Sequence, residues 1–169
     1  MQQTSVDRQD FLAIIESNQR IIFKICNSYC RHATDREDLA QEIIFQLWKS
    51  WNSFNATVKI STWMYRIALN VAISFYRKGQ QTNRMVLMGD QLIELIDEKA
   101  DSELETKLTA LQQFINELKP LDKALMILYL EEKPHQEIAE IIGISSTNVA
   151  TKIGRIKVQL KQKFTNQPL

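Results

Sequence analysis

Apolar residues recur at intervals of three and four along most of this 169-residue chain, and few residues interrupt the pattern. From Asp10 to Tyr29 the spacing predicts one amphipathic helix with a single buried face. The whole chain has only four glycines and three prolines, the residues that most often turn or end a helix. We therefore predict an all-α protein.

The same spacing continues through two further helices of a first domain, residues 8–79. Thr34 with Glu37 three residues later has the pattern of a capping box, in which each side chain accepts a hydrogen bond from a free backbone N–H at the helix start. A second helix is therefore expected over 35–51, and a third over 61–78. The core stripe expected on the third helix is Ile60, Met64, Ile67, Val71 and Phe75.

A second all-α domain is expected over residues 104–165, after a linker over residues 80–103 in which the apolar periodicity is weak. Pro120 ends one helix of this domain, because proline disfavours helical geometry in the residue before it. Pro134 opens a later one, because proline is tolerated in a first helical turn.

The net charge of +1 conceals blocks of opposite sign. Residues 59–84 carry five basic residues and no acid, and residues 141–169 carry five more and again no acid. Between them, residues 89–107 carry seven acids and two lysines. This alternation predicts two phosphate-facing surfaces joined by a connector that does not bind nucleic acid.

Residues 135–160 have the spacing of a helix-turn-helix. Gly143 permits the turn, and Ser145 or Ser146 can cap the helix that follows. Short polar and basic side chains lie opposite the apolar stripe of that helix and suit base edges and phosphates, although a solvated basic helix end is the alternative. The residues expected to contact duplex DNA are Ser146, Thr147, Asn148, Thr151, Lys152 and Arg155.

The helix over 61–78 carries a second candidate nucleic-acid face. An aromatic side chain and two arginines along one face suit a partly unstacked strand, because aromatics stack on bases while arginines hold phosphates. Trp63, near a polar loop, could line a pocket for an extruded base, or it could be an ordinary core residue. The residues that share this stripe are Trp63, Arg66, Asn70, Ser74 and Arg77.

The helix over 35–51 presents acids beside Phe45 and Trp48. This face is a poor surface for DNA and a plausible one for docking a protein, with a solvated charged face as the alternative.

Cys26 and Cys30 lie four residues apart near His32. A structural metal site needs three or four ligands, and this group lacks a convincing fourth, so we expect reduced cysteines packed as small hydrophobic residues and no cofactor.

No apolar run approaches the roughly 18 residues of a membrane span, and the polar N-terminus does not resemble a signal peptide. A soluble, cytoplasmic protein is expected.

Three segments together resemble the extracytoplasmic-function (ECF) sigma factors of the sigma-70 family, which keep sigma regions 2 and 4 joined by a linker. DREDLAQEIIFQLW (35–48) is similar to the region 2 helix that docks on the clamp of the largest polymerase subunit. ISTWMYRIALNVAISFYRK (60–78) resembles the segment that melts and reads the minus-ten promoter element. HQEIAEIIGISSTNVATKIGRIK (135–157) resembles the region 4 helix-turn-helix that reads the minus-thirty-five element.

The resemblance implies a non-enzymatic factor that binds core RNA polymerase and directs it to promoter DNA, and family habit adds an anti-sigma factor as a partner. The core polymerase-binding residues that it implies are Asp35, Asp38, Gln41, Glu42, Phe45 and Trp48. The minus-ten residues are Lys59, Thr62, Trp63, Arg66, Asn70, Ser74 and Arg77. Family members usually have an acid at Ser74, a phenylalanine at Ile60 and often arginines at Ala150 and Lys152, so the promoter sequence stays open.

Two other functions are weighed against this one. A stand-alone helix-turn-helix regulator shares the C-terminal pattern but does not explain the acidic helix or the stripe that starts at Trp63. A small helical nuclease or hydrolase would use Asp35, Asp38 and Glu42 as metal ligands, but no nucleophile–base pair or phosphate-binding loop supports it.

Overall fold

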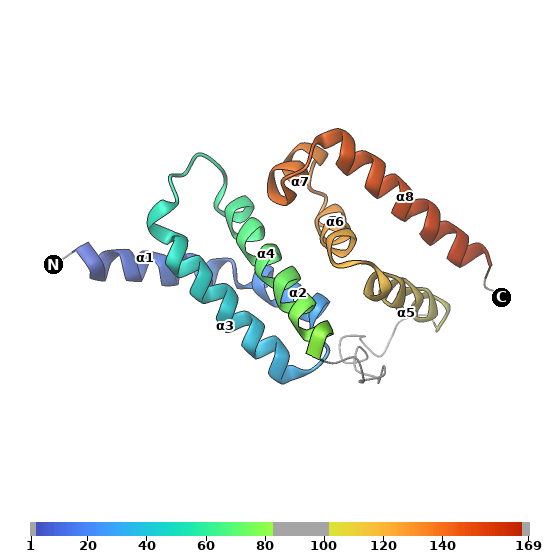
Figure 1. Ribbon diagram of the computed structural model, residues 1–169, viewed down its shortest axis with the longest axis horizontal. Helices are drawn as coiled ribbons and strands as arrows, with labels where there is room; N and C mark the ends of the chain where they lie inside the picture. Colours follow the sequence, from blue (N-terminus) through green and yellow to red (C-terminus); the bar gives the residue numbers. More distant parts are fainter. Residues whose placement is uncertain (1–2, 83–101, 167–169) are drawn as a thin grey trace. The chain divides into compact units, whose positions relative to one another are not determined.

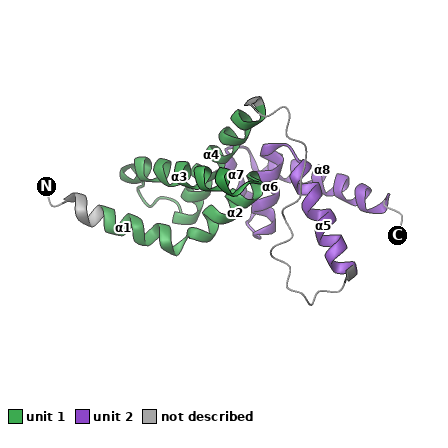
Figure 2. Cartoon of the chain, turned by 90° about the horizontal axis from the view of Figure 1, so that it is seen from below, with its two compact units in different colours: residues 1–82 green, residues 83–169 purple. Residues whose placement is uncertain are grey.

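The computed structural model describes residues 3–82 and 102–166, and the chain divides into two compact units, residues 1–82 and 83–169 (Figures 1 and 2). Every regular element of the described residues is a helix, which confirms the all-α prediction. The linker expected over residues 80–103 lies almost entirely outside the described residues. Residues 80–82 belong to the last helix of the first unit, and residues 102–103 to the first helix of the second.

The first unit is built on three helices that pack against one another: α2 (Gln19–Tyr29), α3 (Ala33–Ser50) and α4 (Ile60–Thr82). Helix α1 (Gln3–Ser17) precedes them, and the short 3-10 helix η1 (Trp51–Ser53) continues α3 into the loop before α4 (Figure 1). Burial of their apolar faces is the main stabilising contribution. The largest fully buried side chains of this unit are Ile25, Leu39, Ile43, Leu47, Met64 and Leu69.

The single helix expected over 10–29 is wrong, because the chain breaks at Asn18 into α1 and α2. The φ and ψ angles of Asn18 are −120° and 15°, outside the helical region. Its side-chain Nδ2 donates to the Ile14 carbonyl at 2.9 Å. Asparagine competes for backbone groups in this way, so it interrupts a helix that the apolar spacing alone predicts.

The capping box expected at Thr34 is also wrong, because α3 begins at Ala33, two residues before the helix start that such a box requires. His32 is the N-cap residue, its side chain makes no cap hydrogen bond, and Thr34 therefore lies inside the first turn. The backbone carbonyl of His32 accepts from the N–H of Arg36 at 3.0 Å.

The core stripe expected on α4 is displaced around the helix. Of the five expected residues only Met64 is buried, while Val71 and Phe75 are partly exposed. Because α2 and α3 both pack on α4, a broad face is covered, and small alanines allow the close approach. The other buried hydrophobic residues of α4 are Trp63, Tyr65, Ala68, Leu69, Ala72 and Ile73.

The second unit holds α5 (Ser102–Glu117), α6 (Pro120–Leu130), α7 (His135–Ile142) and α8 (Ser146–Thr165). Pro120 starts α6 and Pro134 is the N-cap of α7, so both prolines mark helix starts as expected. Helix α6 packs against the other three helices of its unit. One core cluster joins α5, α6 and α8 and consists of Phe114, Ile115, Met126 and Ile156.

Cys26 and Cys30 are both buried in the first unit and form no disulfide, which confirms their expected packing as small hydrophobic residues. Burial raises the pKa of the Cys26 thiol from its usual 9.0 to about 11, and the charge of Arg36 opposes that rise in part.

Among the described residues no helix combines the length and apolarity that crossing a membrane would need.

Candidate functional site

The turn between α7 and α8 is held by backbone geometry that only glycine adopts without strain. Gly143 has a φ of 82°, in the left-handed region. Its N–H donates to the Ala139 carbonyl at 2.8 Å, and the N–H of Ile144 donates to the same oxygen at 3.3 Å. The pair of bonds closes the end of α7 and sets the direction in which α8 begins.

Ser145 caps α8. Its side-chain oxygen accepts a hydrogen bond from the backbone N–H of Asn148, at 3.1 Å. The choice that the sequence left between Ser145 and Ser146 is thereby decided, and Ser146 becomes the first residue of the helix.

All six residues expected to contact duplex DNA lie on the first half of α8. Lys152 is partly buried, the other five are exposed, and the buried residues of α8 are Val149, Ile153 and Ile156. The hydroxyl of Thr151 donates to the Thr147 carbonyl at 3.0 Å, so that hydroxyl already has a partner within the helix. This half of α8 is a narrow polar and basic ridge of the kind that enters a major groove.

The second half of α8 makes contacts within its own unit that the sequence did not reveal. The Lys157 ammonium lies 4.2 Å from the centre of the Tyr129 ring. Lys163 bridges to Glu117 of α5 and lies 5.9 Å from the centre of the Phe114 ring. These two lysines therefore help to hold α8 against the rest of its unit. No local pattern announces such contacts, because the partners lie on other helices.

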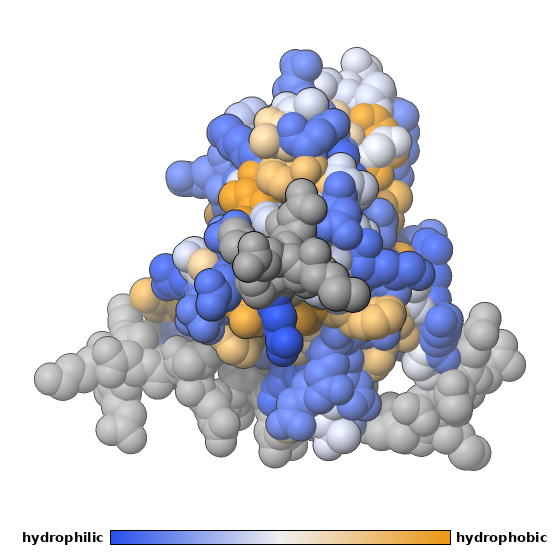
Figure 3. Space-filling view, turned by 90° about the vertical axis from the view of Figure 1, so that its left-hand side faces the viewer, coloured by the Kyte–Doolittle hydropathy of each residue, from blue (hydrophilic) through white to orange (hydrophobic). Residues whose placement is uncertain are grey.

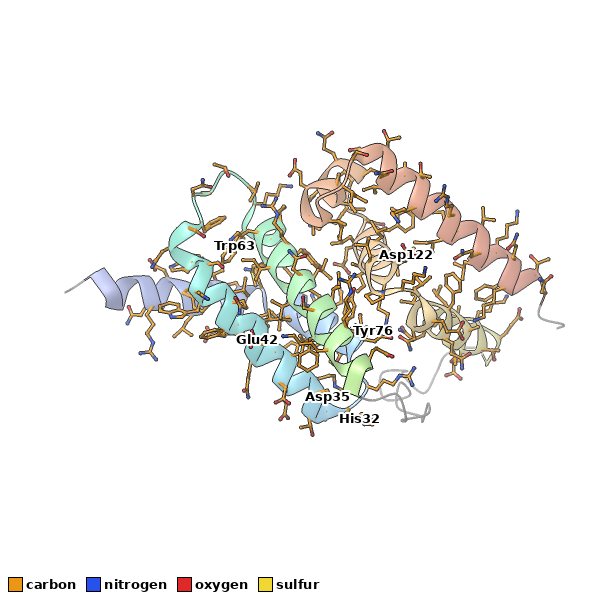
Figure 4. All side chains as sticks on the ribbon, viewed as in Figure 1. His32, Asp35, Glu42, Trp63, Tyr76 and Asp122 are labelled. Atoms are coloured by element: carbon orange, nitrogen blue, oxygen red, sulfur yellow. The ribbon has the colours of Figure 1, made fainter. Side chains whose placement is uncertain are left out.

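The acidic face of α3 is open to solvent. Phe45 is 56% exposed and Trp48 is 43% exposed, which is high for aromatic side chains, and Ile44 beside them is a further exposed residue that sequence reasoning missed. Figure 4 shows Asp35 and Glu42 along α3. On the side of the molecule drawn in Figure 3, hydrophobic surface (orange) is exposed between hydrophilic residues (blue). The exposed acids and apolar groups on one helix fit a protein partner better than DNA.

A groove of about 570 Å³ runs between α3 and α4. Asp38 and Glu42 border it from α3, and Asn70 and Ser74 border it from α4. The groove thus joins residues that the sequence assigned to two different partners. Its remaining lining residues are Gln46, Val71, Phe75 and Lys78.

The start of α4 is packed differently from the expected surface stripe. Trp63 is only 7% exposed, and its ring lies 6.1 Å from that of Trp51 and 5.1 Å from that of Phe54, measured between ring centres. Figure 4 shows Trp63 at the end of α4 nearest the loop from α3. Thr62 is also buried. Trp63 thus occupies the core position that the sequence left open as the alternative, and no signal in the sequence paired it with Trp51 and Phe54.

The other residues expected to contact the minus-ten element reach the surface. Lys59, Asn70, Ser74 and Arg77 are exposed, and Arg66 is partly exposed. They extend along α4 from the residue that precedes it to its last turns, and Ala56 in the preceding loop has a positive φ of 57°. Together with the loop they form a polar and basic surface on the first unit.

Two family models match the chain, one in each unit. Sigma-70 region 2 matches residues 14–82, and Sigma-70 region 4 matches residues 108–160. The chain belongs to the sigma-70 family.

Curated relatives extend this result to the ECF sigma factors. The ECF RNA polymerase sigma factor SigW of Bacillus subtilis is 26% identical to this chain and covers 94% of it, with 90% of SigW aligned. The RNA polymerase sigma factor SigV of the same organism is 26% identical over 92% of this chain and 91% of SigV.

Solved structures show the same fold at lower sequence identity. CnrH, in complex with the cytosolic domain of CnrY, has a TM-score of 0.68 at 17% identity and covers 95% of this chain and 91% of its own. The sigma factor RpoE of Bartonella quintana, in complex with the anti-sigma factor NepR, has a TM-score of 0.69 at 18% identity, with coverages of 95% and 98%. Both sigma regions are thus present in sequence and fold. The protein is an ECF sigma factor that directs RNA polymerase to promoters, and not a stand-alone regulator.

Proposed function

We propose that this sigma factor divides its work among three surfaces, the first of which docks on the clamp of core RNA polymerase. Support comes from α3, where acids and exposed aromatic side chains share one outward face. Acids steer the factor toward a basic partner, and the aromatic rings are buried on contact. The residues assigned to this surface are Asp35, Asp38, Gln41, Glu42, Phe45 and Trp48.

The second surface melts and reads the minus-ten element. Lys59, Arg66 and Arg77 are its cations, and Asn70 and Ser74 offer hydrogen-bonding groups to unstacked bases. Thr62 and Trp63 support this surface from beneath, since both are buried in the free protein. Ser74 stands where the family usually has an acid, so the base preference at that point is proposed to differ from the family's.

The third surface is the exposed ridge of α8, which reads the minus-thirty-five element in the major groove. The single observation that carries this assignment is that five of the six polar and basic residues are exposed, with Lys152 partly buried, on the side of α8 away from the buried Val149. The Ser145 cap and the left-handed Gly143 set the direction of this helix. Arg155 is the residue assigned the strongest base or phosphate contact, because its planar guanidinium makes paired hydrogen bonds.

Three finer assignments belong to the same proposal. The protein acts without catalysing a reaction of its own, and it works in the bacterial cytoplasm, where core polymerase and promoter DNA lie. An anti-sigma factor holds it inactive, a role supported by the complexes in which the similar folds CnrH and RpoE were solved.

The division of surfaces is tested with two variants of the full chain. Asp38→Ala combined with Glu42→Ala is expected to weaken core polymerase binding about tenfold, because two steering charges at the contact are lost. Arg155→Ala is expected to reduce upstream-element binding by the assembled holoenzyme about tenfold or more and to leave core affinity unchanged.

Asp10→Ala combined with Glu16→Ala is the matched control, because it removes two exposed acids from α1 of the same unit. Core affinity is measured by competition with a labelled factor, and upstream binding by footprinting. Equal loss of both activities in the two test variants would show that the surfaces are not divided in this way.

A further inference from the structure

Phe11 is the residue of α1 whose side chain is most deeply enclosed among those described, at 3% exposed. Its ring centre lies 5.0 Å from that of Trp48 and 5.7 Å from that of Trp51, with both pairs edge to face. It lies just before residues 14–82, which the region 2 family model matches. The pattern that identifies the family therefore assigns it no role.

Of the two rings that Phe11 contacts, Trp48 belongs to the proposed docking surface, and Trp51 contacts Trp63, which supports the proposed minus-ten surface from beneath. Trp48 is 43% exposed, so Phe11 holds one side of the indole while the other stays open for the polymerase. Trp51 stacks on Phe54 at 6.0 Å and an interplanar angle of 17°, and it also meets Trp63. Those contacts continue from the end of α3 to the start of α4, below the minus-ten surface.

We propose that Phe11 is a positioning residue that serves both surfaces: it orients Trp48 for polymerase docking and Trp51 for the loop that precedes α4. Phe11 itself contacts neither polymerase nor DNA, since its ring is enclosed by aromatic neighbours. Aromatic pairs prefer edge-to-face geometry, so one phenyl ring fixes the angles of two indoles at once. Aliphatic side chains of similar volume fill the space without setting those angles. The inference rests on the proposed function of α3 and α4.

The experiment separates positioning from mere stability with a double-mutant cycle in the full chain. Phe11→Leu is expected to weaken core polymerase binding about fivefold, and Trp48→Ala to weaken it by at least as much. In the Trp48→Ala background, Phe11→Leu is expected to change core affinity less than twofold, because no indole remains to be positioned. Leu12→Ala, at an exposed neighbour on α1, is the control and is expected to have no effect.

Promoter opening supplies the second readout, measured as strand-separation rate with every core polymerase occupied. Phe11→Leu is expected to slow opening about threefold, and to add nothing in a Trp51→Ala background. Circular dichroism checks that each variant keeps its helical signal, and Phe11→Met replaces Phe11→Leu if the latter does not fold.

The outcomes distinguish the positioning role of Phe11 from the proposed docking surface on α3. If Trp48→Ala weakens core binding and Phe11→Leu does not, or if the effect of Phe11→Leu persists undiminished in the Trp48→Ala background, the positioning role is overturned and the docking surface stands. An unchanged opening rate in Phe11→Leu likewise overturns the role toward Trp51. If Trp48→Ala leaves core affinity unchanged, the docking assignment of Trp48 is itself wrong, and the positioning role falls with it.

Discussion

At the scale of single residues, the buried Cys26 thiol predicts how stability changes at alkaline pH. Its pKa in the folded protein is raised from 9.0 to about 11, so the fold retains the thiol proton more tightly than the unfolded chain does. This contribution to the free energy of unfolding is fully present below pH 9 and is lost as pH rises toward 11. Burial also raises the pKa of Tyr29, which adds to the loss above pH 10.

Urea unfolding at pH 7 and pH 11 measures the effect, with Cys26→Ala as the comparison. The variant is expected to lose less stability between the two pH values than the unchanged protein, because the thiol no longer titrates. Identical losses would contradict the role given to Cys26.

Some single-residue roles could be predicted from the sequence and others could not. The cysteines were expected to pack as hydrophobic residues, and both are buried. Ser145 and Ser146 were equal candidates for the cap, because either hydroxyl can reach a free N–H, and only the backbone geometry selects Ser145. Trp63 was placed in a DNA-facing stripe, with an ordinary core position as the alternative. Its burial depends on Trp51 and Phe54, which helical spacing cannot relate to it.

At the scale of secondary structure, the starts of α6, α7 and α8 followed from Pro120, Pro134 and the turn at Gly143. The N-terminal boundaries were harder, because a side-chain hydrogen bond from Asn18 breaks a helix that apolar spacing continues through. The predicted buried face of α4 was also misplaced. Both α2 and α3 pack on α4, whereas the apolar spacing predicts a stripe wide enough to contact one helix only.

Two glycines of the helix-turn-helix predict opposite effects of the same substitution. A Cβ atom would meet nothing within 4 Å at either Gly143 or Gly154, so only the backbone distinguishes them. Gly143→Ala is expected to destabilise the protein by about 1 kcal/mol or more, because its φ of 82° is strained for alanine. Gly154→Ala is expected to stabilise it by about 0.5–1 kcal/mol, because alanine is favoured within a helix such as α8.

The free energy of unfolding in urea gives the sign of each change, and hydrogen exchange assigns it to the second unit. Changes of the same sign at both positions would contradict the backbone argument.

At the scale of the whole molecule, the charge blocks predicted two nucleic-acid surfaces from a chain of net charge +1. One block lies largely on α4 and the other on α8, one in each unit. Charge patterning did not reveal which cations are free to bind phosphate. Lys152 lies on the half of α8 assigned to DNA, whereas Lys163 bridges to Glu117 within its own unit.

This difference predicts how salt affects promoter binding by the holoenzyme. Lys152→Gln is expected to reduce the slope of log affinity against log salt concentration by about 0.9, the value for one phosphate contact. Lys163→Gln is expected to leave the slope unchanged. The slope is measured between about 50 and 200 mM salt with every core polymerase occupied. Equal changes in the two variants would contradict the division of α8 into two halves.

The central claim is that this chain directs core RNA polymerase to specific promoters. Run-off transcription with purified core polymerase and a genomic library of promoters, with and without the protein, tests it most directly. The account predicts discrete transcripts that require the protein and disappear with the combined Asp38→Ala and Glu42→Ala variant at limiting concentration. The absence of any protein-dependent transcript, under conditions in which another sigma factor works with the same core, would contradict it.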